Sequence, residues 1–178
     1  MYNRIHIFGA SGSGTSTLGA ALARHLQYQH FDSDKYYWLP TNPPFQIKRE
    51  IEDRQKLLLA DLASDSWVLS GSLCKWGDVA IPLFDLVVFL WLPSDIRIPR
   101  LRNREVQRYG EEAISPDGHL HSKSNEFIEW AMRYDEGDEN IRSRELHERW
   151  LKKIKCRIVR IEEDISIDEK ISRILNNP

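Results

Sequence analysis

A glycine-rich turn between a strand-like and a helix-like segment is the feature that most restricts the fold of this chain. A short β-prone run at residues 4–8 is followed at once by three glycines: Gly9, Gly12 and Gly14. From Ser16 onward, leucines recur at every fourth position, which is the spacing of one helix face: Leu18, Leu22 and Leu26. Glycine allows the sharp backbone turn that such a connection needs. The sequence therefore predicts a strand, a tight turn and a helix.

The rest of the chain continues to alternate between the two kinds of segment. Further strands are expected near 30–31 and at 67–70, 86–92 and 156–161. Further helices are expected at 47–63, from 94 onward, at 125–133, at 138–154 and from 167 onward, with loops at 36–45 and 110–122. Such alternation is typical of an α/β fold with a mostly parallel sheet. We predict one α/β domain over residues 1–178, with five parallel strands between two helical layers.

Composition excludes some functional classes. A net charge of −2 in 178 residues gives no general attraction to nucleic acid or anionic membranes. No apolar run is long enough to span a bilayer, and the first residues lack a secretory pattern. Cys74 and Cys156 form neither a metal-binding spacing nor a disulfide framework, so a reducing cytoplasm is the expected location.

The glycine turn matches a phosphate-binding loop (P-loop) at every fixed position except one, because Thr15 stands where lysine is expected. Exposed backbone N–H groups and the start of the following helix would attract phosphate oxygens. Ser16 is placed to put its hydroxyl on Mg²⁺. The residues expected to bind ATP are Gly9, Ser11, Gly12, Ser13, Gly14, Thr15, Ser16 and Thr17. The alternative is a Gly/Ser-rich turn without a ligand.

Arginines are available to replace the missing lysine. That lysine normally supplies charge at the β- and γ-phosphates, and an arginine at the transferring phosphoryl group can contribute a factor of about 10³ to 10⁵ in rate. The chain contains two arginine-rich groups: Arg97, Arg100, Arg102, Arg104 and Arg108, then Arg133, Arg142, Arg144 and Arg149. The alternative is a solvated surface with salt bridges, because glutamates lie among these arginines.

With these motifs the chain resembles the nucleoside-monophosphate kinase group, in particular adenylate-kinase-like and cytidylate-kinase-like P-loop proteins. Arg100-x-x-x-Arg104 resembles the start of their mobile lid, and Arg133 and Arg144, eleven positions apart, resemble its end. The resemblance implies a strand order of 2-3-1-4-5, a lid at about 100–145 and dependence on ATP and Mg²⁺. It places Arg100 near the adenine and Arg104, Arg133 and Arg144 at the phosphates. It also implies that the lid closes over bound nucleotide, and some cytidylate-kinase-like proteins share a Thr at the lysine position.

Two acids follow the second expected strand. By resemblance to small-molecule kinases, Asp32 would help to hold Mg²⁺ and Asp34 would orient the acceptor hydroxyl. A carboxylate near the γ-phosphate can hold the metal's water shell, and a second can orient an attacking hydroxyl. The alternative is an Asx turn or a helix cap.

The acceptor is not specified by the sequence. After the third strand the related kinases carry Asp-Gly-Phe-Pro-Arg, whereas this chain has Ser-Gly-Ser-Leu-Cys-Lys, so Lys75 is the only cation in this stretch. Lys48, Arg49 and Arg54 lie where those kinases bind the acceptor phosphate, but a plain surface is the alternative. Trp38 and Trp130 are expected in the core rather than in the cleft. A nucleoside monophosphate, a non-nucleotide alcohol or an acid remain as acceptors.

Taken together, the motifs predict transfer of the γ-phosphoryl group of ATP to a small acceptor. One alternative is an ATP-binding regulator with weak or no turnover, which Thr15 and the missing acceptor arginine favour. A simple NTPase is another. Nucleic acid is not an expected partner, although the arginine cluster leaves that role open.

Overall fold

The computed structural model describes residues 2–176. Its sheet consists of five parallel strands in the order β2-β3-β1-β4-β5, which confirms the expected strand order. The strands are β1 (Arg4–Gly9), β2 (Gln29–Asp32), β3 (Trp67–Ser70), β4 (Leu86–Leu90) and β5 (Arg157–Ile161). The α-helices are α1 (Thr15–Leu26), α2 (Ser33–Tyr37), α3 (Ile51–Asp61), α4 (Ser94–Tyr109), α5 (Glu111–Ile114), α6 (His121–Met132), α7 (Arg144–Leu151) and α8 (Ile167–Leu175), with a 3₁₀ helix, η1, at Asp78–Leu83.

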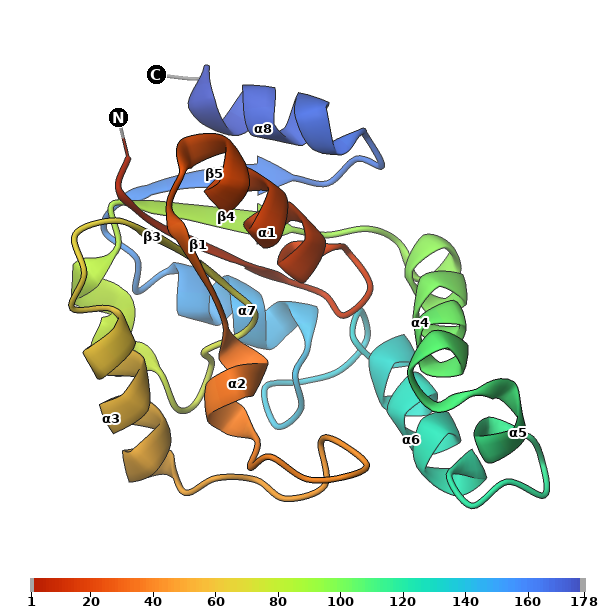
Figure 1. The fold of residues 1–178 in the computed structure, drawn as a ribbon. Coiled ribbons are helices and arrows are strands. Elements are labelled where there is room, and N and C mark those ends of the chain that lie inside the picture. Colours follow the sequence, from red (N-terminus) through yellow and green to blue (C-terminus); the bar gives the residue numbers. More distant parts are fainter. Residues whose placement is uncertain (1, 177–178) are drawn as a thin grey trace.

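Helices cover both faces of the sheet (Figure 1). On one face, α1 and α8 pack against the alternate apolar residues of β1 and β4, such as Ile5, Ile7 and Val88. On the other face, α3 and α7 pack against residues such as Phe8 and Phe89. Because β4 is buried on both sides, all five of its residues are apolar. This explains why its unbroken apolar run was easy to identify from the sequence.

The helices α4, α5 and α6 form an arm beside the carboxyl end of β4 (Figure 1). The arm has a small apolar cluster of its own, built from Leu101 on α4 and Ile128 and Ala131 on α6. Here the sequence was a poorer guide, because 110–122 was expected to be loop and instead contains α5 and the first two residues of α6. Residues 111–114 are polar at two of four positions, so they carry no helical period that a pattern could detect.

Two expected helices are shorter than predicted because local hydrogen bonds compete with the helical ladder. The helix expected at 138–154 begins only at Arg144, since Asp138 accepts a hydrogen bond from the Asn140 amide and Ser143 caps α7 through the Leu146 amide. The helix expected at 47–63 begins at Ile51, because Lys48 forms an antiparallel bridge with Trp38. None of the described helices combines the length and the apolar composition that crossing a membrane requires.

A histidine lies in the core on the α7 side of β1. His6 is fully buried, stacks on Phe8 and Phe84 at ring distances of 5.3 and 4.9 Å, and donates its Nδ1–H to the Leu69 carbonyl at 3.2 Å. Burial lowers the pKa of His6 to about 3, against the smaller opposing effect of that hydrogen bond. The imidazole is therefore neutral in the folded protein at neutral pH.

We expect this histidine to make the fold sensitive to mild acid. Below about pH 6.5 the unfolded chain protonates His6 while the folded chain does not, so the free energy of unfolding falls by about 1.4 kcal/mol per pH unit from this group as the pH drops toward 3. Urea unfolding at several pH values between about 7.5 and 5 measures the slope. His6→Phe should flatten it, and the exposed His119→Ala should not; equal slopes in all three proteins would contradict the assignment.

Candidate functional site

The glycine turn forms a tight loop between β1 and α1. A Cβ at Gly9 would lie 1.9 Å from the Leu90 carbonyl oxygen, so no other residue fits beside β4. Gly12 and Gly14 have φ angles of +86° and +93°, a region that favours glycine. The Ser13 hydroxyl closes the turn by donating to the Ala10 carbonyl at 2.6 Å. The loop thus directs the first amides of α1, which have no intrahelical acceptor, toward the carboxyl edge of the sheet.

The two residues expected to bind metal are in direct contact. The Ser16 hydroxyl donates to Asp32 Oδ2 at 2.5 Å, and the Ser70 hydroxyl donates to the same oxygen at 3.0 Å. Asp32 Oδ1 accepts the Asp34 amide and caps α2, so the Asx-cap alternative describes part of its role. Hydroxyl and carboxylate oxygens are the ligands that Mg²⁺ prefers, and this pair fits that ion.

A large cavity of about 1240 Å³ opens over the loop. Its walls come from the glycine loop, the carboxyl ends of β2 and β3, helices α4 and α6, and the segment between β5 and α8. Aromatic and basic side chains of the arm line it: Arg100, Arg104, Arg108, Tyr109, Lys123, Phe127 and Trp130. Trp38 and Trp130, which we expected in the core, are only half-buried and line this cavity. The expected ATP-binding residues 9 and 11–17 all lie along its wall.

Asp34 lines this cavity together with several arginines, among them Arg104 and Arg142. Burial of its carboxyl group and, next, the charge of Asp32 raise the pKa of Asp34, while Arg142, Arg104 and Arg108 oppose the shift. Partial burial lowers the pKa of the Arg104 guanidinium, and the neighbouring Arg108 lowers it further. The expected catalytic residues Asp34 and Arg104 therefore face the same space and influence each other electrostatically.

Arg142 is a site residue that we did not select from the sequence. It lines the cavity, and its guanidinium lies 5.2 Å from the centre of the Trp130 ring. The expected partners of Arg104 at the end of the lid were Arg133 and Arg144, chosen by their eleven-residue spacing. Neither lines the cavity. The signal that could have found Arg142 was the nearby Trp130, on which a guanidinium can stack.

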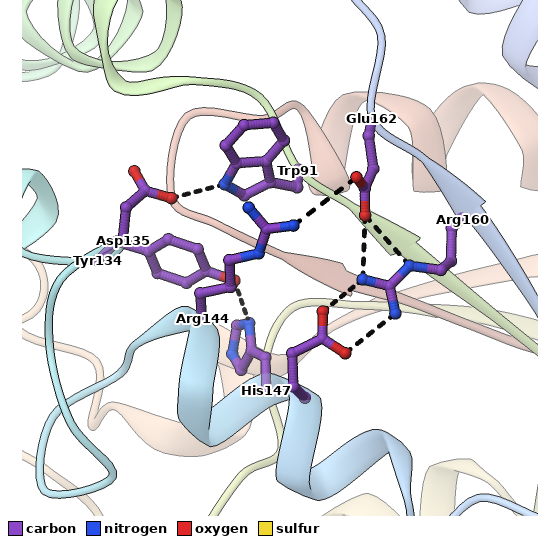
Figure 2. Close-up of polar contacts among 8 residues, drawn as sticks. Trp91, Tyr134, Asp135, Arg144, His147, Arg160 and Glu162 are labelled. Atoms are coloured by element: carbon purple, nitrogen blue, oxygen red, sulfur yellow. Dashed lines mark hydrogen bonds and ion pairs between the residues drawn. The ribbon is translucent and has the colours of Figure 1, made fainter.

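Arg144 is outside the cavity lining, and Figure 2 shows its guanidinium between Trp91 and Glu162. Its guanidinium stacks on Trp91 at 4.5 Å and pairs with Glu162 at 3.8 Å, and Glu162 also binds Arg160. Arg133 is exposed at the end of α6. Arg100 does line the cavity, and both oxygens of Asp164 accept from it at 2.9 and 2.8 Å.

A second cavity of about 460 Å³ adjoins the first. The two share the lining residues Tyr37, Lys48, Ser72, Trp130 and Arg142. The smaller cavity also contains Arg54 and Lys75, and its described lining includes no carboxylate. Lys75, the cation that we noted in place of the acceptor arginine, donates to the Asn140 carbonyl at 3.0 Å.

Arg54 is the most enclosed cation of the smaller cavity. Only 7% of it is exposed, its Nε–H donates to the Arg49 carbonyl, and its guanidinium lies 3.9 Å from the centre of the Tyr37 ring. No acidic partner is described for it. Burying a positive charge without a carboxylate partner costs free energy, and a bound anion would offset that cost. The charge of this cavity is therefore suited to an anion.

Arg97 supports the site without lining it. The side chain is fully buried, and its Nε–H donates to the Leu92 carbonyl at 2.7 Å. Its Nη1 donates to Ser11 in the glycine loop at 3.2 Å and to Ala131 at 3.3 Å, and its Nη2 pairs with Asp135 at 2.7 Å. The sequence showed this arginine only as one of a series, and nothing in the pattern distinguished it from its exposed neighbours.

The strand order and the glycine loop between β1 and α1 define the P-loop class of nucleotide-binding folds. The chain belongs to the AAA domain family, whose model matches residues 5–117, more than half of the sequence. It is 50% identical over 177 residues to the uncharacterized protein YqaC of Bacillus subtilis (strain 168), covering 99% of this chain and 97% of that protein.

Solved structures of small kinases share the fold. A shikimate kinase from Bacteroides thetaiotaomicron matches with a TM-score of 0.59 at 18% identity, covering 99% of this chain and 98% of that one. A deoxyadenosine kinase from M. mycoides with bound dATP matches with a TM-score of 0.51 at 14% identity, covering 97% of each chain. At these identities the likeness concerns the fold, and it confirms the expected resemblance to small P-loop kinases at that level.

We expect Arg97→Met to destabilise the protein by about 2–4 kcal/mol, because three carbonyl groups and Asp135 lose their donor. Urea unfolding monitored by tryptophan fluorescence measures the change. The exposed Arg102→Met on the same helix is the matched control and should stay within about 0.5 kcal/mol of the parent. A similarly small effect of Arg97→Met would contradict the supporting role.

Proposed function

We propose that this protein is an ATP- and Mg²⁺-dependent phosphotransferase that moves the γ-phosphoryl group to a small anionic acceptor. The observation that carries the proposal is the continuity of two cavities. One contains the glycine loop and the Ser16–Asp32 pair, and the other contains cations without a carboxylate. A donor phosphate and an anionic acceptor would meet where the two join.

On the donor side, the amides of the glycine loop would hold the β- and γ-phosphates. Ser16 and Asp32 would hold Mg²⁺, which neutralises phosphate charge when it is bound. Arg100, fixed by Asp164 beside the segment between β5 and α8, would lie against the adenine. ATP and Mg²⁺ as the cofactors are part of this proposal.

Arg104 and Arg142 would replace the P-loop lysine. Both influence Asp34 across the large cavity, and both are held by aromatic rings, Arg104 at 5.5 Å from Phe127. A guanidinium placed in this way can stabilise the charge that develops on the transferring phosphoryl group. Arg133 and Arg144 stay predictions of the lid resemblance, and Arg144 would have to leave Trp91 and Glu162 to reach the phosphates.

On the acceptor side, Asp34 would accept a hydrogen bond from the attacking hydroxyl and orient it. Arg54, Lys48 and Lys75 would bind a phosphate or carboxylate of the same molecule, and the rings of Tyr37 and Trp76 would flank its body. The solved structures named for shikimate and deoxyadenosine support a small acceptor, and of these two molecules shikimate carries a carboxylate. The adenylate-kinase-like subtype and a cytoplasmic location remain predictions.

An ATP-binding regulator with little turnover is the second candidate, and the specific observation in its favour is Thr15. A simple NTPase is the third. The three differ in their response to an acceptor, because a kinase consumes ATP mainly when the acceptor is present, an NTPase does so equally without it, and a regulator binds ATP without consuming it.

We expect ADP formation from ATP and Mg²⁺ to be stimulated by at least one anionic acceptor. A coupled assay against nucleoside monophosphates, hydroxy acids and sugar acids measures this, with calorimetry of ATP binding beside it. Tight ATP binding with no acceptor stimulation across the panel would favour the regulator, and acceptor-independent hydrolysis would favour the NTPase. Absence of any ATP binding would overturn all three.

We expect Arg104→Ala and Arg142→Ala each to lower kcat by about 10³-fold while ATP affinity changes far less, because their charge acts mainly in the transition state. Single-turnover kinetics and calorimetry separate the two effects. Arg102→Ala, at an exposed position two residues before Arg104, is the control and should retain the parent's kcat. Full turnover in Arg104→Ala would remove that residue from the mechanism.

A further inference from the structure

A chain of three buried polar side chains ends at the junction of the two cavities. Ser72 lines both cavities and is 6% exposed. Its hydroxyl oxygen lies 3.1 Å from His147 Nε2, and His147 Nδ1 lies 2.8 Å from the Tyr134 hydroxyl. His147 is fully buried and Tyr134 is 2% exposed. Figure 2 shows Tyr134 and His147 side by side, with the dashed bond between them.

The position of each proton in this chain follows from the available partners. Among the described residues the Tyr134 hydroxyl has one hydrogen-bond partner, His147 Nδ1. If Nδ1 carried the proton, the phenol hydrogen would be buried without an acceptor, which costs about 1–3 kcal/mol. The phenol therefore donates to Nδ1, and the neutral imidazole carries its proton on Nε2.

The same reasoning extends to Ser72. Its oxygen accepts from His147 Nε2–H and, at 3.5 Å, from the Cys74 amide. Both lone pairs of the oxygen are thereby used. Among the described residues, the remaining Ser72 O–H hydrogen has only the weakly accepting Cys74 sulfur as a protein partner, and the free space next to it is the junction of the cavities, where an oxyanion would be a stronger acceptor.

We propose that Ser72 is a specificity-determining residue that donates a hydrogen bond to an oxygen of the acceptor, and that His147 and Tyr134 are positioning residues that fix it as a donor. This inference rests on the proposed function, because it concerns the acceptor bound at that junction. The ligand group is an oxyanion oxygen of a phosphate or a carboxylate. A ligand that places an N–H group at this point would be rejected, because two donors would face each other.

His147 remains neutral around neutral pH, and this keeps the arrangement of donors and acceptors constant. Burial lowers the pKa of His147 well below its usual range, and the positive charge of Arg142 lowers it further. The neighbouring rings of Phe8, Phe89 and Tyr134 enclose it and offer no carboxylate. A protonated imidazole would still donate to Ser72 but would lose the hydrogen bond from Tyr134. The full chain of hydrogen bonds therefore requires a neutral imidazole.

The first experiment requires no ligand and reads the wild-type protein. Two-bond ¹H–¹⁵N NMR correlations of the wild-type protein report which nitrogen of His147 is protonated, with His147→Gln used only to assign the signal. We expect the Nε2–H tautomer. The Nδ1–H tautomer would overturn the proposal, because Ser72 would then donate to the ring instead of to a ligand.

The second experiment tests the ligand contact. With the donor site filled by a non-hydrolysable ATP analogue and Mg²⁺, inorganic phosphate is titrated by calorimetry. Loss of a hydrogen bond to a charged group should weaken phosphate binding by about tenfold in Ser72→Ala. Tyr134→Phe should also weaken phosphate binding, because without the phenol donor His147 is no longer held in the form protonated on Nε2.

Matched controls are Ser64→Ala, which removes a hydroxyl bonded to Asp61, and Tyr28→Phe, which removes a phenol bonded to Asn3, both remote from the cavities. Unchanged phosphate affinity in a folded Ser72→Ala would overturn the proposal. If the ATP analogue fails to bind, the proposed function has failed, and the tautomer measurement still decides the inference.

Discussion

The buried guanidinium of Arg97 is the interaction that holds the parts of the site together. It binds carbonyl groups from three segments that are far apart in sequence: the glycine loop, the stretch just after β4 and the end of α6. Its charge is balanced by Asp135, at the start of the segment that leads to Arg142. The arm of α4 and α6 is therefore connected to the phosphate loop by a charged group, and not only by apolar packing. A lysine could not do this, because it lacks a planar fork of donors.

Charge is distributed unevenly around the two cavities. Several arginines are neutralised on the surface, such as Arg160 by Glu148 and Glu162 and Arg173 by Glu163. The described structure gives no acidic partner within salt-bridge distance to Arg54, Arg104 or Arg142, which all line a cavity. Uncompensated cations raise the local potential and attract anions. The presence of Thr15 in place of the P-loop lysine thus removes one cation from a site that has several others.

Much of the fold could be predicted from the sequence because its signals are local. The apolar run of β4, the leucine period of α1 and the glycine turn each lie within a few residues, and the structure contains all three. The start of α7 could not be predicted, because it depends on the turn that Asp138 forms with the Asn140 amide and on capping by Ser143. Ser16 was expected at the metal from the P-loop pattern and Asp32 from the resemblance to small-molecule kinases, and the structure brings the two into contact. Arg142 and Ser72, in contrast, join the site through contacts between distant segments. Spacing along the chain carries no information about such contacts.

Under the proposed function, the position of Arg142 on the boundary of both cavities would make the two binding events interdependent. One guanidinium carries one charge, and an anion that binds it from either side reduces the attraction left for the other. Two anions at the junction also repel each other, at a distance where protein rather than bulk water lies between them. By thermodynamic reciprocity, whatever the first ligand does to the affinity of the second, the second does to the first. The boundary residue therefore makes the pair of cavities one antagonistically coupled unit, in which occupancy of each side sets the concentration needed to fill the other.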